Sequence, residues 1–215
     1  MMHPMPDATA PPIDDVAARV TAVLLAAGAG SRFRAPGHKL AAALAANAPR
    51  PDETVAARAC ASAVAAFGSV TDETGALVED ELGIEAPADV SFVDNPRWSS
   101  GQASSVQVGL EAARQAGATI VVIGLGDQPG IQPESWRRVA ESSTPHTPIA
   151  VATYEGRRAN PVALHRRVWD DVADTGDQGA RSLMALRPDD VVEVPCSGSP
   201  DDIDTVEDLS RWQNN

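Results

Sequence analysis

The sequence has few cysteines and no long apolar run. Two cysteines among 215 residues, Cys60 and Cys196, form neither a disulfide framework nor a cysteine-rich metal site, and they favour a reducing cytoplasm. No apolar run approaches the ~18 residues that a membrane-spanning helix needs, so we expect no membrane partner. Residues 1–19 lack the basic and apolar segments of a secretory signal. We expect them to be a disordered tail, and residues 20–215 to form a single domain.

An excess of positive charge is also absent. Seventeen Lys and Arg against 30 Asp and Glu give a net charge of −13, which argues against a nucleic-acid partner. A nucleotide substrate is not excluded, because its site needs only a few local cations and a metal ion. A hydrophobic content of 43% is typical of a globular domain with its own core.

Lysine occurs once, at position 39, and closes a glycine-rich loop. The apolar run 22–26 predicts a buried strand, and Gly28, Gly30 and Arg32 follow it. Glycines after a strand let the backbone approach a ligand, and its N–H groups can hold phosphate oxygens. Arg32 and Lys39 add positive charge suited to a polyphosphate. The alternative is a solvated surface lysine placed by chance.

Two better-known loops do not match this stretch. A Walker A loop needs a hydroxyl after its lysine, and Leu40 stands there. A dinucleotide fingerprint needs a third glycine, and Phe33 stands in its place. The stretch LAAGAGSRF followed by K-L instead resembles the signature loop of nucleotidyltransferases with a Rossmann-like fold. These include molybdenum cofactor guanylyl- and cytidylyltransferases and sugar-phosphate nucleotidylyltransferases.

This resemblance implies roles for the loop. Arg32 and Lys39 would be catalytic residues that neutralise a triphosphate. The LAAG form, where guanylyl enzymes usually carry LAGG, resembles pyrimidine-using members and implies CTP. The nucleotide-binding residues implied in the loop are Leu25, Ala26, Ala27, Gly28 and Gly30.

A second apolar run, 119–126, predicts a central strand ending at Asp127. Open α/β sheets bind ligands at the carboxyl ends of their strands, and a carboxylate beside phosphates suits Mg²⁺. A turn aspartate before Gln-Pro is the simpler alternative. The run resembles the family's G-D-x-P motif, which implies Asp127 as a catalytic residue and metal ligand. The family also implies Asp204 as the second metal ligand, with Asp202 in reserve.

Three further segments resemble the cytidylyltransferase group. NPRWSSGQASS implies that Gly101, Ser104 and Ser105 contact the base or ribose, although helix capping would also explain them. YEGRRANPV implies Asn160 in acceptor binding, and TGDQGARSL implies Gly179 and Arg181. Asp177 is expected to cap the helix that follows it.

The resemblance implies an α/β protein: a three-layer α/β/α sandwich around a mostly parallel, Rossmann-like sheet of the nucleotide-diphospho-sugar transferase type. Thr205 and Asp208 predict a capping box that begins the last helix. The expected helices are 40–46, 52–66, 72–83 and 133–141, and the other expected strands are 67–71, 90–93, 148–153 and 191–194.

The resemblance implies Mg²⁺-dependent transfer of CMP from CTP to a phosphorylated acceptor such as molybdopterin, with release of pyrophosphate. A sugar or alditol phosphate is an alternative acceptor, and a molybdoenzyme or its maturation factor is an implied partner. A reductase using NAD(P)H is a rival, but Phe33 and the lack of an acidic residue ending a clear second strand count against it. The set Lys39, Asp127 and Asp204 counts against a catalytically silent binding or chaperone protein.

Overall fold

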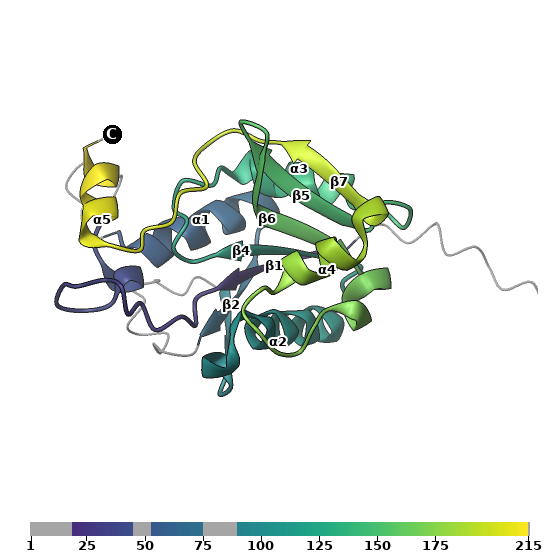
Figure 1. Cartoon of the computed structure of the whole chain (residues 1–215), viewed down its shortest axis with the longest axis horizontal. Helices are drawn as coiled ribbons and strands as arrows, with labels where there is room; N and C mark the ends of the chain where they lie inside the picture. The colour runs from purple at the N-terminus through teal and green to yellow at the C-terminus, as the bar shows by residue number, and fades with distance from the viewer. Residues whose placement is uncertain (1–18, 45–52, 75–89, 215) are drawn as a thin grey trace, which may run out of the picture.

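A seven-stranded sheet organises the computed structural model, which describes residues 19–44, 53–74 and 90–214. The strand order is β3-β2-β1-β4-β6-β5-β7, and β6 alone runs antiparallel to its neighbours (Figure 1). The strands are β1 (Val20–Leu25), β2 (Val70–Thr74), β3 (Val90–Asp94), β4 (Ile120–Leu125), β5 (Ile149–Tyr154), β6 (Arg157–His165) and β7 (Val191–Pro195).

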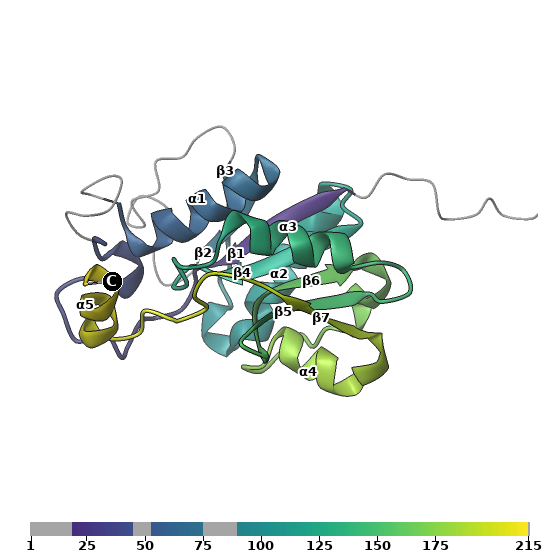
Figure 2. The ribbon, with the colours of Figure 1, turned by 90° about the horizontal axis from the view of Figure 1, so that it is seen from above.

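Helices cover both faces of this sheet, which confirms the expected three-layer sandwich. Figure 2 shows α1 and α3 on one face, and α2 and α4 on the other. The α-helices are α1 (Val55–Phe67), α2 (Gln102–Gln115), α3 (Pro133–Ser142), α4 (Ala180–Leu186) and α5 (Val206–Gln213), and the 3₁₀ helices are η2 (Lys39–Ala41), η4 (Trp98–Ser100), η5 (Arg166–Asp171) and η6 (Pro188–Asp190). In the part of the chain that the structure describes, no helix could cross a membrane.

Glycines allow two helices to pack close to the central strands. A Cβ atom at Gly124 of β4 would lie 2.3 Å from the ring of Trp136, the largest fully buried side chain of α3. A Cβ atom at Gly109 of α2 would lie 2.5 Å from Val23 of β1. Both glycines therefore set the spacing between helix layer and sheet.

The helix expected at 40–46 is wrong for its described part. Only Lys39–Ala41 turns, as a 3₁₀ helix, and Ala43 then pairs with Thr54 as an isolated β-bridge. Tertiary contacts override the helix propensity of the alanines here. Residues 45–52, which include the rest of this prediction, lie outside the described residues, as does the expected tail apart from Arg19.

The strand expected at 67–71 and the helix expected at 72–83 are also misplaced. Helix α1 continues through Phe67 and ends at Gly68, which is left-handed with a φ of 80°. Strand β2 then runs from Val70 to Thr74. Asp72 and Glu73 are therefore buried in a strand, where the charge pattern predicted the solvent-exposed start of a helix. Residues 75–83 lie outside the described residues.

Candidate active site

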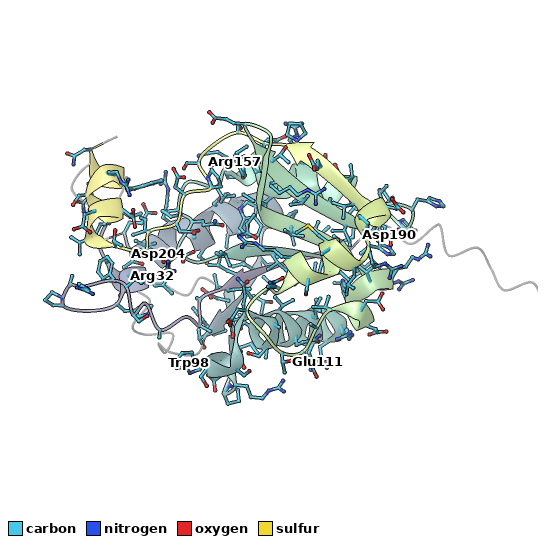
Figure 3. The ribbon with its side chains drawn as sticks, viewed as in Figure 1. Arg32, Trp98, Glu111, Arg157, Asp190 and Asp204 are labelled. Atoms are coloured by element: carbon cyan, nitrogen blue, oxygen red, sulfur yellow. The ribbon has the colours of Figure 1, made fainter. Side chains whose placement is uncertain are left out.

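Three segments distant in sequence bring one ammonium between two carboxylates. The Nζ atom of Lys39 lies 2.6 Å from Oδ2 of Asp127 and 2.7 Å from Oδ1 of Asp204. Arg32 reaches the other oxygen of Asp204 at 2.9 Å, and Figure 3 shows these two side chains together. Lys39 begins η2, Asp127 follows β4, and Asp204 precedes α5. The cluster thus lies at the carboxyl ends of the central strands, where ligands bind in open α/β sheets.

Backbone contacts hold Asp204 in this cluster. The N–H of Ile203 donates to the carbonyl oxygen of Asp127 at 2.9 Å, and the buried Ile203 side chain packs in a cluster with Phe33 and Leu40. The predicted capping box is confirmed: Thr205 accepts from the Asp208 N–H, and the Asp208 carboxylate accepts from the Thr205 N–H. The segment before α5 is therefore fixed on both sides of Asp204.

The charge of Lys39 is maintained in spite of its burial. Only 8% of Lys39 is exposed, and this burial lowers its pKa. Asp127 and Asp204 more than offset that effect, so the pKa of Lys39 is raised and the ammonium stays charged. Nearby, burial and the charges of Asp127 and Asp204 raise the pKa of Asp202, and a hydrogen bond from Gln128 opposes them.

A cavity of about 340 Å³ opens beside the charged cluster. The predicted site residues that line it are Leu25, Ala26, Ala27, Gly28, Lys39, Gly101, Ser105 and Asp127. The predicted nucleotide contacts Gly30 and Ser104 do not line it, and neither do the ion-paired Arg32 and Asp204. Gly30 instead forms a turn, where its φ is 60° and a Cβ atom would lie 2.7 Å from His38.

Ser104 is a structural residue at the start of α2. It is fully buried, and its hydroxyl lies 3.0 Å from the carbonyl oxygen of Arg97 and 2.9 Å from that of Gly101. It also accepts from the amide of Asn95 at 3.1 Å. Ser105, the next residue, is the serine that faces the cavity.

A second cavity of about 320 Å³ adjoins the first, and the two share Leu25, Gln102 and Leu125. Its apolar lining includes Val106, Ile123, Val151, Val162 and Met184, and its polar lining includes Arg158, Asn160, Gln178 and Arg181. Asn160 and Arg181 thus both line this second cavity, whereas Gly179 does not. Gly179 packs on α2, since a Cβ atom there would lie 3.2 Å from the Gln102 side chain.

The expected capping role of Asp177 is wrong. Gly179 is the N-cap of α4, and no side chain caps it. Asp177 lines the first cavity instead, where its Oδ1 would lie 2.6 Å from a Cβ atom at Gly101. The N–H of Ala103 donates to Gly176 at 2.9 Å, which ties this loop to the start of α2. The left-handed φ of 46° at Gly179 turns the chain between Asp177 and the helix.

Sequence reasoning also missed a buried acidic pair on β2. Asp72 and Glu73 are both 0% exposed, and neither oxygen of Asp72 accepts a hydrogen bond from the described residues. Burial raises the pKa of Glu73 to about 7, opposed by the Asn95 and Ser105 side chains. Burial and Glu73 raise the pKa of Asp72 as well. The second strand therefore does carry acids directly before its last residue, Thr74, which corrects one argument against the reductase, although these side chains are too buried to face a ribose.

The oxygen donors of the charged cluster are few. Among the described residues, no group of three or more His, Cys, Asp or Glu side chains could hold a metal ion by itself. Asp127 nevertheless keeps one oxygen, Oδ1, that is buried and accepts no hydrogen bond from the described residues. Two carboxylates of this kind suit Mg²⁺ or Mn²⁺ only together with phosphate oxygens or water.

A family model for the MobA-like NTP transferase domain matches residues 22–191. The chain belongs to this family. The resemblance of its loop to the nucleotidyltransferases is thereby confirmed.

Known proteins similar to this MobA-like chain carry different names. Nicotine blue oxidoreductase of Paenarthrobacter nicotinovorans is 31% identical over 204 residues, 89% of this chain and 95% of that protein. Rv0371c from Mycobacterium tuberculosis H37Rv superimposes with a TM-score of 0.74 at 28% identity, covering 93% of this chain and 100% of that one. Its manganese complex superimposes at 0.66, with 27% identity over 92% of this chain and 99% of that one. A nucleotidyl transferase from Methanothermobacter thermautotroptrophicus, at 24% identity and a TM-score of 0.72 over 91% of this chain and 96% of that one, shares the fold.

Proposed function

We propose that this MobA-like protein is a nucleotidyltransferase that moves CMP from CTP to a phosphorylated acceptor and releases pyrophosphate. One observation carries the proposal: a charged cluster of Lys39, Asp127 and Asp204 borders a cavity that adjoins a second one. A nucleotide in the first cavity would have its phosphates beside Lys39. An acceptor in the second cavity would approach across the wall formed by Leu25 and Leu125.

The reaction is an in-line displacement. An oxygen of the acceptor phosphate forms a bond to the α-phosphorus of the nucleotide. The bond from that phosphorus to the oxygen that bridges to the β-phosphorus breaks, and pyrophosphate leaves with the electron pair. The attacking phosphate is already an anion, so no general base is needed. Positioning and charge stabilisation then supply the catalysis, with Lys39 and Arg32 beside the triphosphate.

A divalent cation fits the same cluster. The unpaired, buried Oδ1 of Asp127 and the oxygens of Asp204 are hard ligands, which Mg²⁺ prefers together with phosphate oxygens. The manganese complex of the relative Rv0371c supports a divalent metal in this family. When bound, Mg²⁺ would neutralise charge on the phosphates. Asp127 and Asp204 would hold it, with Lys39 shifting from the carboxylates to the phosphates.

The LAAG form of the loop supports CTP, and the resemblance to cytidylyltransferases supports molybdopterin as the acceptor. A sugar or alditol phosphate is the alternative acceptor. A molybdoenzyme or its maturation factor would then receive the product.

Thermal unfolding with CTP, GTP, UTP, ATP or NADPH, each with and without Mg²⁺, tests the nucleotide. Ligand at ~100 times its Kd stabilises the folded state by about 2.7 kcal/mol, a shift of several degrees in a domain of this size. We expect a shift with CTP that needs Mg²⁺ and that is lost in Asp127→Ala. If Asp127→Ala kept full Mg²⁺-dependent turnover in a pyrophosphate-release assay, the metal assignment would be wrong.

The name of one relative, nicotine blue oxidoreductase, favours a second candidate: a reductase using NAD(P)H. A reductase should show a rise in melting temperature with NADPH that does not depend on Mg²⁺. It should also show loss of absorbance at the nicotinamide band of NADPH when nicotine blue is added. Such a result without any nucleotide effect would replace the transferase proposal.

A further inference from the structure

A buried glutamine connects the charged cluster to the second cavity. Gln128 follows Asp127 and is 5% exposed. Its amide nitrogen donates to the carbonyl oxygen of Pro200 at 2.9 Å and to Oδ1 of Asp202 at 2.7 Å. Its amide oxygen, Oε1, accepts from Nδ2 of Asn160 at 3.1 Å. Asn160 lines the second cavity, so these bonds form a continuous path from Asp202 to the cavity wall.

The direction of every bond in this path is fixed by chemistry. A backbone carbonyl carries no proton in any state, so the group of Gln128 that meets Pro200 must be its nitrogen. The oxygen of Gln128 then faces Asn160, and an oxygen can only accept. Asn160 must therefore turn its own nitrogen toward Gln128, since the flipped amide would place two oxygens 3.1 Å apart.

This orientation decides what Asn160 can offer to a bound molecule. Its Oδ1 atom accepts no hydrogen bond from the described residues, while its nitrogen is engaged by Gln128. An oxygen at the cavity wall selects for a ligand group that donates a hydrogen bond. Asn160 is half-buried, and a ligand that covers its oxygen without donating to it would cost more than an ordinary hydrogen bond gains.

We infer that Gln128 is a positioning residue that presents Oδ1 of Asn160 to the second cavity, and that the acceptor carries an N–H or O–H donor on an apolar body with an anionic group. The anionic group would pair with Arg181, and the apolar body would pack on Val106, Val151 and Met184 of the cavity wall. The inference rests on the proposed function only in calling this molecule the acceptor.

Two small probes test the donor preference directly. 6-Amino-2-naphthoate and 6-methoxy-2-naphthoate share a carboxylate and an apolar body, but only the amine donates. Calorimetric titration of the wild-type protein should give tighter binding of the amine by several-fold, the range of one net hydrogen bond. Equal binding, preference for the methoxy probe, or no binding of either would overturn the inference.

Gln128→Met separates positioning from a general structural role. Without Gln128 the Asn160 amide can turn either way, so the two probes should bind with nearly equal affinity. A structural role would weaken both probes equally and keep their ratio, which would overturn the assignment to Gln128. Gln107→Met is the matched control, because the Gln107 amide also donates to a backbone carbonyl, that of Val172 at 2.7 Å, whereas the bond of Asn160 is to Gln128.

A third variant keeps the test decisive if Gln128→Met does not fold. Asn160→Leu keeps the side-chain size but removes the oxygen, and it should abolish the preference while Arg181 still binds the carboxylate. Preference retained in Asn160→Leu would overturn the inference. These titrations involve no turnover. A failed pyrophosphate-release assay with the expected probe preference would reject the proposed function alone, and the reverse result would reject the inference alone.

Discussion

The ammonium of Lys39 lies 2.6 Å from the carboxylate of Asp127 and 2.7 Å from that of Asp204. With Arg32, which pairs with the other oxygen of Asp204, it balances the charge of two acids that would otherwise repel each other. A compact ammonium can reach both carboxylates from one point, whereas a planar guanidinium is broader and more directional. This geometry accounts for a lysine at the one position where the chain uses it.

Lys39→Met should lower turnover by ~100-fold or more, because a preorganised charge beside the phosphates is lost. The variant should also unfold at a lower temperature without metal, since Asp127 then loses its ion pair and Asp204 keeps only the one with Arg32. Mg²⁺ should raise its melting temperature more than that of the wild type. Arg138→Met, which removes an exposed charge on α3, is the control for the loss of one cation. A fully active Lys39→Met protein would contradict the catalytic role.

Two adjacent serines should behave differently. Ser105→Ala should raise the KM for the nucleotide, because Ser105 lines the first cavity, and it should also cost some stability, because its hydroxyl accepts from the Asn95 amide at 3.1 Å. Ser104→Ala should leave the KM unchanged. Ser104→Ala should lower the free energy of unfolding by about 1–3 kcal/mol, since it removes one of the two serine hydroxyls that accept from the buried Asn95 amide, together with that hydroxyl's own contact to the Gly101 carbonyl oxygen. Urea denaturation and nucleotide kinetics on both variants distinguish the two roles. Identical behaviour would show that the assignment of the pair is wrong.

Gly101→Ala should reduce nucleotide affinity. Its φ of 111° is strained for alanine, and the new Cβ would lie 2.6 Å from Asp177 and 2.7 Å from Gly176. Gly156→Ala, with a φ of 77° and open space around it, carries the backbone strain alone. Both variants should therefore lose stability, but only Gly101→Ala should weaken CTP binding by titration. Equal CTP affinity in the two variants would contradict a contact between Gly101 and the nucleotide.

Glu73→Gln should change how stability depends on pH. The folded-state pKa of Glu73, about 7, exceeds its ordinary value of 4.5, so the folded protein binds more protons between these values. The free energy of unfolding of the wild type should therefore fall as the pH rises from about 4.5 to about 7, by up to about 3 kcal/mol from this group.

Urea denaturation across this pH range gives the comparison. Glu73 also raises the pKa of Asp72, so the difference between wild type and Glu73→Gln reports the charge of Glu73 together with its effect on Asp72. The variant should lose the Glu73 contribution and be the more stable protein at pH 8. Parallel curves for the two proteins would mean that Glu73 is not protonated on folding.

The sequence predicted best where local pattern and fold agree. The runs around Val23 and Val122 are apolar on both faces, as central parallel strands require, and Asp127 lies at the strand end as expected. Thr205 and Asp208 form a local motif, and the capping box was predicted correctly.

Prediction failed where long-range contacts decide. β2 buries Asp72 and Glu73 between neighbouring strands, and charge patterning indicates solvent for such residues. Asp177 followed the pattern of an N-cap, but a glycine at 179 turns the chain and leaves its carboxylate in the cavity wall. Gln128 offered no signal at all, because its importance lies in two partners, Asn160 and Asp202, that only the fold brings together.

The bond between Lys39 and Asp204 joins positions 165 residues apart. A partly folded intermediate that has built only one half of the sheet therefore cannot assemble the charged cluster. A ligand can bind at this cluster only when the whole domain is folded. The free energy of binding therefore stabilises a contact that closes a loop of nearly the entire sequence. The charged cluster that would bind a triphosphate thus protects the segments around Lys39 and Asp204 from local unfolding. Hydrogen exchange in α5 should therefore slow when a nucleotide is bound.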